Sequence, residues 1–337
     1  MLLRPSPALL AGQAQQISWP GLNLCIQQNR PADLLEPYDW MRLREEARAL
    51  NLGFEIVAPA DIDLIVSGEG RRAIRRCGVE VELPDAVLPH TGSGTDYFSL
   101  AILRQLEHLC VDVINSSQAI EAVKDKLYAH QILSQRKLPI PRTMLVRFPV
   151  DVDLVAQQIG FPCVVKLLVG TFGEGILLSR DPADFRDLIE LIASMNRAQA
   201  LILQQYIGSR PGQHLRVWVI GGRVLGAMLR RSTDGSFKAN ISRGGDGEAH
   251  PLNAEIERIA LDSAAALQLD IAGVDLLFDR DSYCVCEVNS APGFSGFEAA
   301  TGVNVAEAIL QHALRRAGVA PRWIPGAQHP QAAAVHR

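Results

Sequence analysis

The sequence predicts a mixed α/β (α+β) protein built from several sheets with helices packed against them. Short runs rich in valine, isoleucine and leucine alternate along the chain with longer amphipathic segments, which is the pattern of α/β folds. The 337 residues are 48% hydrophobic, enough for a large core and two or three domains. The net charge of −4 provides no general positive field for nucleic acid, so no direct nucleic-acid contact is expected.

Residues 1–20 predict a loose leader without a signal peptide, because no apolar run in it is long enough. No run anywhere approaches the roughly 18 apolar residues that a membrane span requires. The six cysteines are scattered, mostly within apolar runs, and indicate buried free thiols in a reducing compartment. Cys284 and Cys286 form the only close pair and are expected in the core rather than on zinc. We therefore expect a cytoplasmic protein that does not bind membranes.

Residues 21–115 predict an N-terminal α/β domain. Its strands are expected at 22–27, 54–58, 62–66 and 85–90, its helices at 38–50 and 97–109, and its closing segment at 111–114. The glycine-rich loop before the second helix ends at Thr95 and Asp96, either of which can cap that helix. The loop either holds an anion on its backbone N–H groups or is only a turn, and the sequence leaves both interpretations open.

Residues 116–199 predict a smaller unit with a glycine-rich lid. Its expected elements are a helix up to about residue 135, a strand at 143–146, a helix at 152–159 and a strand that follows it. The loop from Gly170 to Gly175 has apolar β-runs on both sides, so it predicts a hairpin lid over phosphates rather than a dinucleotide-binding turn. Lys166 lies inside the preceding apolar strand. It needs an anionic partner there, unless its side chain reaches solvent from an edge strand.

Residues 200–318 predict the largest unit, and residues 319–337 a disordered tail rich in proline, alanine, glutamine and histidine. The first strand of the large unit, 200–208, ends in a hinge. A hairpin across Gly221 and Gly222 follows. The other expected elements are helices at 253–267 and 304–317 and a hairpin at 271–289, whose two strands are joined by a polar turn.

This last hairpin carries a candidate metal site. Glu287 and Asn289 are two residues apart on one strand, so they share a face. Asp275 joins them only if the turn holds an odd number of residues, as Arg280 to Ser282 would. Two carboxylates and an amide oxygen suit Mg²⁺. The alternative is an edge hairpin with solvated polar residues.

Together with Lys126, Lys166 and four later basic residues, these oxygens indicate a nucleoside triphosphate site. At these residues the chain resembles the ATP-grasp superfamily, in its RimK-like glutamate-ligase branch. The resemblance spans about residues 85–310. It is carried by Val164-Val-Lys166, Gly170-Thr-Phe-Gly-Glu-Gly175, Ser242-Arg-Gly-Gly245, Ala272-Gly-Val-Asp275 and Glu287-Val-Asn-Ser-Ala-Pro-Gly293. It implies an ATP-grasp fold, with 116–199 and 200–318 as its small and large subdomains, preceded by a Rossmann-like pre-ATP-grasp domain.

The resemblance also implies a role for each candidate residue. Asp275, Glu287 and Asn289 would bind two Mg²⁺ ions, with Mn²⁺ as a possible substitute and Glu287 as the bridge. The ATP contacts would come from Lys126, Lys166, Gly170, Thr171, Gly173 and Gly175 at the phosphates, Lys238 and Asn240 on the phosphate side, Gln205 and Tyr206 at the adenine, and His214 at the ribose. Arg230 and Arg243, with Asn289, would face the reacting acyl-phosphate or the incoming carboxylates.

The implied activity is ATP-dependent amide formation through an acyl-phosphate. The amine would be L-glutamate or a similar amino acid, and the acceptor a peptide C-terminus, a small acid or a coenzyme. Gln205 and His214 depart from the acidic residues common in the family. This departure makes a nucleotide-binding module without turnover one alternative, and a kinase that stops at phosphoryl transfer is the other. Ligases of this type are often homodimers or homotetramers, so the resemblance leaves both assemblies open. Acceptor specificity is expected in 90–96 and 295–301.

Overall fold

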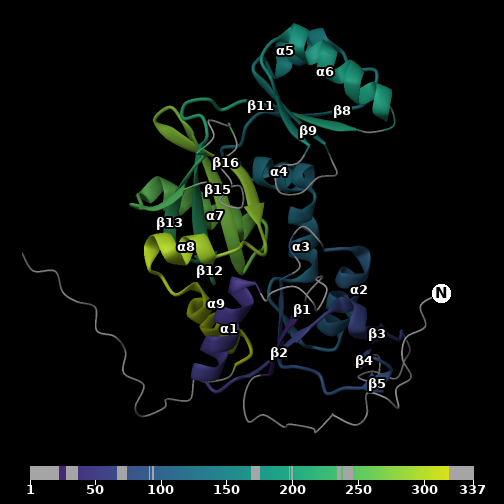
Figure 1. The fold of residues 1–337 in the computed structure, drawn as a ribbon, viewed down its shortest axis with the longest axis vertical. Helices are drawn as coiled ribbons and strands as arrows, with labels where there is room; N and C mark the ends of the chain where they lie inside the picture. The colour runs from purple at the N-terminus through teal and green to yellow at the C-terminus, as the bar shows by residue number, and fades with distance from the viewer. Residues whose placement is uncertain are drawn as a thin grey trace, which may run out of the picture.

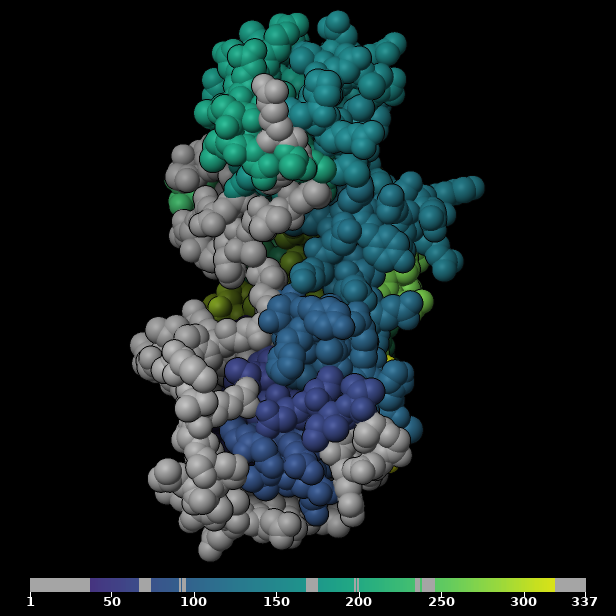
Figure 2. Space-filling model, turned by 90° about the vertical axis from the view of Figure 1, so that its right-hand side faces the viewer, coloured from purple at the N-terminus to yellow at the C-terminus, as the bar shows by residue number. Residues whose placement is uncertain are grey.

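The computed structural model describes residues 23–27, 37–66, 74–90, 92, 95–167, 175–196, 198, 200–233, 237 and 246–318. The predicted leader and tail lie outside these ranges. Within them the strands form four sheets. Two of these sheets lie at the N-terminal end of the molecule, and the other two follow along its length (Figure 1). Figure 2, from the side, shows the N-terminal part at one end and the small subdomain at the other. No helix in the described ranges is long and apolar enough to cross a membrane.

The N-terminal part is built on a parallel sheet in the order β2-β1-β6-β7. These strands are β1 (Asn23–Gln27), β2 (Gly53–Val57), β6 (Ala86–Pro89) and β7 (Asp112–Val113), with the helices α1 (Tyr38–Ala49) and α2 (Tyr97–His108). A small antiparallel sheet of β3 (Ile62–Leu64), β4 (Ile74–Arg76) and β5 (Val79–Glu80) follows the 3₁₀ helix Pro59–Asp61. Of the two expected caps of α2, Asp96 is the one used, since its carboxylate accepts the Ser99 N–H.

The small subdomain is an antiparallel sheet in the order β10-β9-β11-β8. Its strands are β8 (Thr143–Val146), β9 (Cys163–Leu167), β10 (Ile176–Ser179) and β11 (Leu201–Gln205). The sequence predicts the last of these strands as part of the large unit, but β11 pairs with β8 and β9 of the small sheet. One face packs on α5 (Val152–Gln158) and α6 (Pro182–Met195) through a buried apolar cluster. The helix expected before residue 135 is two helices, α3 (Ser117–Lys124) and α4 (Lys126–Gln135), because Asp125 caps a new helix there.

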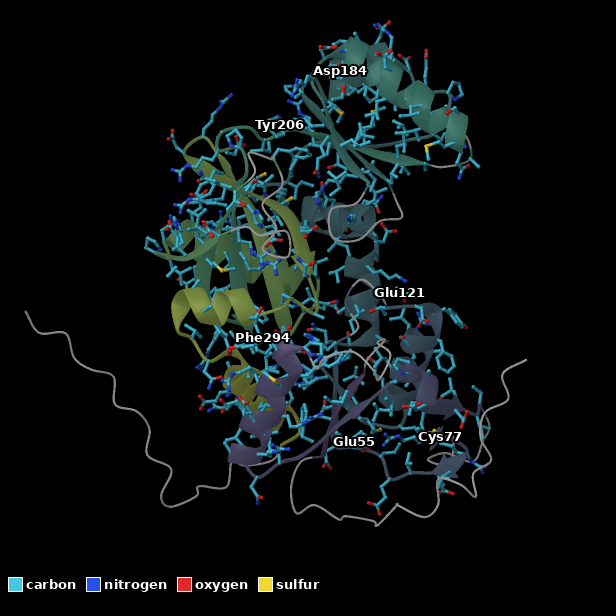
Figure 3. The ribbon with its side chains drawn as sticks, in the orientation of Figure 1. Glu55, Cys77, Glu121, Asp184, Tyr206 and Phe294 are labelled. Carbon is cyan, nitrogen blue, oxygen red and sulfur yellow. The ribbon has the colours of Figure 1, made fainter. Side chains whose placement is uncertain are left out.

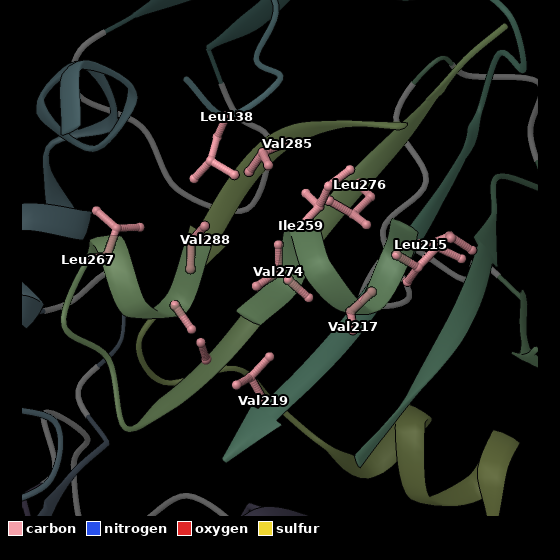
Figure 4. Close-up of a cluster of buried hydrophobic side chains, with 14 of the residues drawn as sticks. Leu138, Leu215, Val217, Val219, Ile259, Leu267, Val274, Leu276, Val285 and Val288 are labelled. Atoms are coloured by element: carbon pink, nitrogen blue, oxygen red, sulfur yellow. The ribbon is translucent and has the colours of Figure 1, made fainter. Parts of the chain in front are cut away.

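The large subdomain is an antiparallel sheet in the order β14-β13-β12-β15-β16. Its strands are β12 (Gln213–Ile220), β13 (Arg223–Arg231), β14 (Asp246–His250), β15 (Ile271–Asp279) and β16 (Ser282–Asn289). One face packs its valine and leucine side chains on α7 (Ala254–Ala266), as Figure 4 shows. The last helices are α8 (Ser295–Thr301) and α9 (Val305–Arg316).

The opposite face of this sheet shares a core with the N-terminal part. Trp40 and Leu43 of α1 belong to the same buried cluster as Trp218 of β12 and Phe294. Polar contacts reinforce this packing. Glu298 accepts hydrogen bonds from the Tyr38 hydroxyl at 2.7 Å and from the backbone N–H of Val305 at 2.8 Å, so one carboxylate joins α1, α8 and the start of α9.

Two further sequence-based expectations were wrong. The β15–β16 connection is a two-residue turn of Arg280 and Asp281, not an odd-numbered one, yet Asp275 still lies opposite Glu287. A β-bulge at Cys286 supplies the missing residue, because an extra residue in one strand shifts the pairing by one. Cys110 is exposed rather than buried, whereas Cys284 is buried as expected.

Candidate active site

A polar row crosses the large sheet on the face opposite α7. Arg216 of β12 pairs with Asp275 of β15, which pairs in turn with Glu287 of β16, so the three side chains are neighbours on one face. Asn289 extends the row, and its Nδ2 donates to Glu287 Oε1 at 3.4 Å. The structure therefore brings together the three oxygen-bearing residues predicted for the metal, with an arginine beside them.

Arg216 donates hydrogen bonds to both carboxylate oxygens of Asp275. Nε donates to Oδ1, and Nη2 donates to Oδ2 at 2.7 Å; both side chains are buried. Burial alone would raise the pKa of the Asp275 carboxyl, but the adjacent guanidinium lowers it far below its usual range. The sequence did not indicate this pair, because Arg216 is there only one of several basic residues that follow Lys166. The available signal was an arginine in the apolar alternation of its strand.

Gly273 makes room for this pair. A Cβ at this position would lie 2.7 Å from Cβ of Pro292 and 3.0 Å from Cδ of Arg216. Only glycine lets the Arg216 side chain and the Pro292 ring approach the β15 backbone together.

His214 lies beside the row on β12. Its Nε2 is 3.9 Å from Oδ1 of Asp275. Burial lowers the pKa of His214 to about 4, against the opposing effect of the Asp275 carboxylate. The imidazole is therefore neutral at physiological pH. Its predicted contact with the ribose stays a prediction.

Arg230 is a cation next to His214 that forms no ion pair with any described residue. It pairs with His214 across β12 and β13, and burial together with Arg216 lowers its pKa to about 10. Its buried Nε has no hydrogen-bond partner, and no ion pair joins it to another of the described residues. A half-buried guanidinium without an ion pair among the described residues is suited to bind an anionic ligand.

Two lysines approach from the small subdomain and α4. Lys166 of β9 lies between Ile176 and Ile202, is only 7% exposed, and has no hydrogen bond or ion pair within the described part of the chain. Lys126 is the first residue of α4. Burial raises the pKa of the Cys286 thiol to about 11, and both ammonium groups oppose this rise. The two lysines thus act electrostatically on the strand that carries Glu287.

The predicted adenine hinge lies where β11 ends. The backbone N–H of Gln205 donates to the Arg142 carbonyl at 2.8 Å. The Tyr206 ring meets Phe237 edge-on at 6.2 Å between centroids. Figure 3 shows Tyr206 where the chain passes from the small sheet toward the large one. Both side chains are half-buried, so the hinge residues are near the site but not sealed in the core.

Some of the remaining predicted residues lie outside the described ranges. Gly175 is described: its carbonyl accepts the Leu167 N–H at 2.9 Å, at the base of the β9–β10 hairpin. The predicted residues outside the described ranges are Gly170, Thr171, Gly173, Lys238, Asn240 and Arg243.

The donor set is compatible with a divalent cation of the Mg²⁺ type. Glu287 has no ion pair with any described residue, and Asn289 offers an amide oxygen because its nitrogen donates to Glu287. Asp275 already accepts from Arg216, but a carboxylate has about four lone-pair directions and can accept a second cation. No cluster of three or more Asp, Glu, His or Cys side chains suited to a metal occurs among the described residues, so the amide would be the third ligand.

Comparison with known proteins gives consistent matches. Residues 123–313 match the family model of the RimK-like ATP-grasp domain, and residues 32–120 match that of the RimK PreATP-grasp domain. The chain is 36% identical over 275 residues to probable alpha-L-glutamate ligase 1 of Shewanella frigidimarina, covering 81% of this chain and 90% of that protein. Against probable alpha-L-glutamate ligase of Thioalkalivibrio sulfidiphilus it is 35% identical over 274 residues, covering 81% and 90%.

Solved structures agree in fold. The ATP-grasp ligase PsnB, complexed with a precursor variant, Mg and ADP, has a TM-score of 0.68 at 20% identity, covering 88% of this chain and 100% of PsnB. The RimK domain ATP-grasp protein of Sphaerobacter thermophilus has a TM-score of 0.67 at 21% identity, covering 86% and 98%. These matches confirm the predicted ATP-grasp fold with its preceding domain.

Proposed function

The chain belongs to the RimK-like ATP-grasp family, and from this premise we propose that it uses ATP to join a carboxylate to the amino group of L-glutamate or a similar amino acid. The observation that carries the proposal is the row of Arg216, Asp275 and Glu287, which adjoins cations without partners in the described part of the chain. Cations for phosphates beside carboxylates for Mg²⁺ are what phosphoryl transfer requires. The acceptor belongs to one of three classes: a peptide C-terminus, a small acid or a coenzyme.

The binding roles follow the residues' positions. Lys166 and Lys126 hold phosphate oxygens, because each is a cation close to β16 that forms no ion pair with any described residue. Tyr206 and Gln205 border the adenine, and His214 borders the ribose as a neutral group. The residues that the structure does not describe complete the set: Gly170, Thr171 and Gly173 over the phosphates, Lys238 and Asn240 on the phosphate side, and Arg243 at the reacting group.

The reaction has two steps. An oxygen of the acceptor carboxylate attacks the γ-phosphorus of ATP, the bond to ADP breaks, and an acyl-phosphate forms. The amino nitrogen of the second substrate then attacks the acyl carbon, loses a proton, and inorganic phosphate leaves with the former carboxylate oxygen. Arg230 stabilises the negative charge of the transferring phosphoryl group and of the tetrahedral oxyanion. The protein contributes orientation and charge rather than a covalent nucleophile.

Asp275, Glu287 and Asn289 would hold the divalent cations, which we place at two per site, with Mn²⁺ able to replace Mg²⁺. The chemistry such cations supply is neutralisation of phosphate oxygens. Arg216 keeps Asp275 ionised, since the guanidinium lowers the pKa of this carboxyl. The carboxylate is therefore always available as a ligand at physiological pH.

The test is phosphate release from ATP and Mg²⁺ with L-glutamate and a panel of acceptors from the three classes. We expect release that depends on both acceptor and amine. Glu287→Gln should reduce it about 10²- to 10³-fold, whereas Glu248→Gln, an exposed carboxylate on β14 of the same sheet, should not. Near-normal turnover of Glu287→Gln would refute the metal role. A stable phosphorylated acceptor without amine dependence would identify a kinase instead.

A further inference from the structure

A buried polar network around His130 connects the two subdomains. His130 is on α4, Thr143 on β8, Gln204 on β11, and the fourth partner is the backbone carbonyl of Cys286 on β16. His130 and Gln204 are 6% and 4% exposed. None of these side chains has a role in the proposed reaction, so a network this deep requires another explanation.

The hydrogen-bond directions in this network are fixed by their partners. His130 Nε2 lies 3.1 Å from the Cys286 carbonyl, which can only accept, so Nε2 carries the hydrogen. Burial lowers the pKa of His130, so the ring is neutral and Nδ1 accepts, with Gln204 Nε2 3.4 Å away as the donor. Thr143 donates to the Pro141 carbonyl at 2.9 Å and accepts from Gln204 at 3.1 Å. The ring is thus neutral and held from both sides.

The carbonyl that His130 holds belongs to the bulge. Cys286 is the extra residue between the pairs Asp275–Glu287 and Leu276–Val285. A bulge interrupts the ladder and re-aims the neighbouring side chain. The Cys286 carbonyl is part of the peptide bond that leads into Glu287, so His130 fixes the peptide plane just before the proposed metal ligand.

The other end of the network reaches the sheet that carries Lys166. Gln204 follows Ile202 by two residues on β11, and Ile202 pairs with Lys166 on β9. Thr143 pairs with Gln204 across β8 and β11. The same few hydrogen bonds therefore set the proposed cation ligands and the phosphate-binding sheet relative to each other.

We propose that His130 is a positioning residue, which orients Glu287 through the Cys286 carbonyl and holds the carboxylate-bearing strand against the sheet of Lys166. The proposal rests on the proposed function, since it takes Glu287 as a ligand. Outer partners of metal ligands typically change metal affinity or activity about 10- to 100-fold when lost.

Two matched substitutions separate this role from simple packing. In His130→Gln, the amide nitrogen can reach the position of Nε2 and keep the bond to Cys286. In His130→Asn, the shorter amide can replace only Nδ1, so that bond is lost. Gln131→Asn, an exposed change on the same helix, is the control.

The readout is the affinity of the protein for ADP, measured by calorimetry with Mg²⁺ and again with a chelator. We expect His130→Asn to lower the gain in ADP affinity that Mg²⁺ brings by about 10-fold. The ADP affinity measured with the chelator should not change. The gain in His130→Gln should be close to that of the unsubstituted protein. Equal effects of the two variants, or no effect of either, would overturn the proposal.

Two further measurements keep the test decisive. If His130→Asn does not fold, Gln204→Met removes the donor to Nδ1 and should lower the same Mg²⁺-dependent gain; an unchanged gain would count against the proposal. Glu287→Gln is measured alongside. If it leaves the Mg²⁺-dependent gain intact, the proposed metal site itself is wrong, and this outcome differs from a failure of His130 alone.

Discussion

Replacing Arg216 with methionine should show how much a buried, unpaired Asp275 carboxylate lowers the free energy of unfolding. Arg216 binds both oxygens of Asp275, and both side chains are buried. Removing one partner of a buried ion pair typically costs about 3–5 kcal/mol, because the other charge is left unpaired. We expect Arg216→Met to lower the free energy of unfolding by about 3 kcal/mol in metal-free buffer.

The loss should depend on pH. In the unsubstituted protein the pKa of Asp275 is lowered, so its contribution to stability is present above the unfolded value and is lost as pH falls through the folded value. Without Arg216, burial raises this pKa, so the variant is penalised where the carboxyl is ionised and recovers as pH falls and the carboxyl protonates. The difference between the two proteins should therefore grow as pH rises from below the usual carboxyl range, where Asp275 of the unsubstituted protein is already ionised, and should level off once the variant's carboxyl is ionised too.

The assay is urea unfolding at several pH values, with a chelator and again with Mg²⁺ and ADP. A ligand at 100 times its dissociation constant stabilises the folded state by about 2.7 kcal/mol. Metal should stabilise Arg216→Met more than the unsubstituted protein, because the cation replaces the lost guanidinium. Arg231→Met, which removes an exposed pair with Glu248 on the same sheet, is the control. A loss no larger than the control's, or one independent of pH, would refute the reasoning.

Three further outcomes follow from the site. Gly273→Ala should lower stability by about 1–3 kcal/mol and reduce turnover, since its Cβ would lie 2.7 Å from Cβ of Pro292; unchanged urea unfolding would contradict this. Arg230→Met should reduce phosphate release about 10²- to 10³-fold without loss of folding, whereas Arg231→Met should not. Because burial lowers the pKa of His214 to about 4, its contribution should be complete above about pH 6.5 and be lost as pH falls toward 4. His214→Gln should therefore flatten the acid limb of stability, and an identical limb would argue against this origin.

The fold and the shared face of Glu287 and Asn289 could be predicted from the sequence, because strand alternation and turn residues are local signals. The register between β15 and β16 could not. Asp275 meets Glu287 through a bulge at Cys286, and nothing in that residue's type signals a bulge. The Arg216–Asp275 pair depends on the alignment of two strands whose residues are 59 positions apart. His130 was missed for the same reason, since its partners come from three other elements.

The core common to both halves of the chain restricts how this enzyme can be divided. Trp40 and Leu43 pack in one cluster with Trp218 and Phe294. A fragment beginning at residue 116 would therefore expose the rings of Trp218 and Phe294 to water. A chimera that took about its first hundred residues from a distant relative would need compensating substitutions on both sides of this shared core.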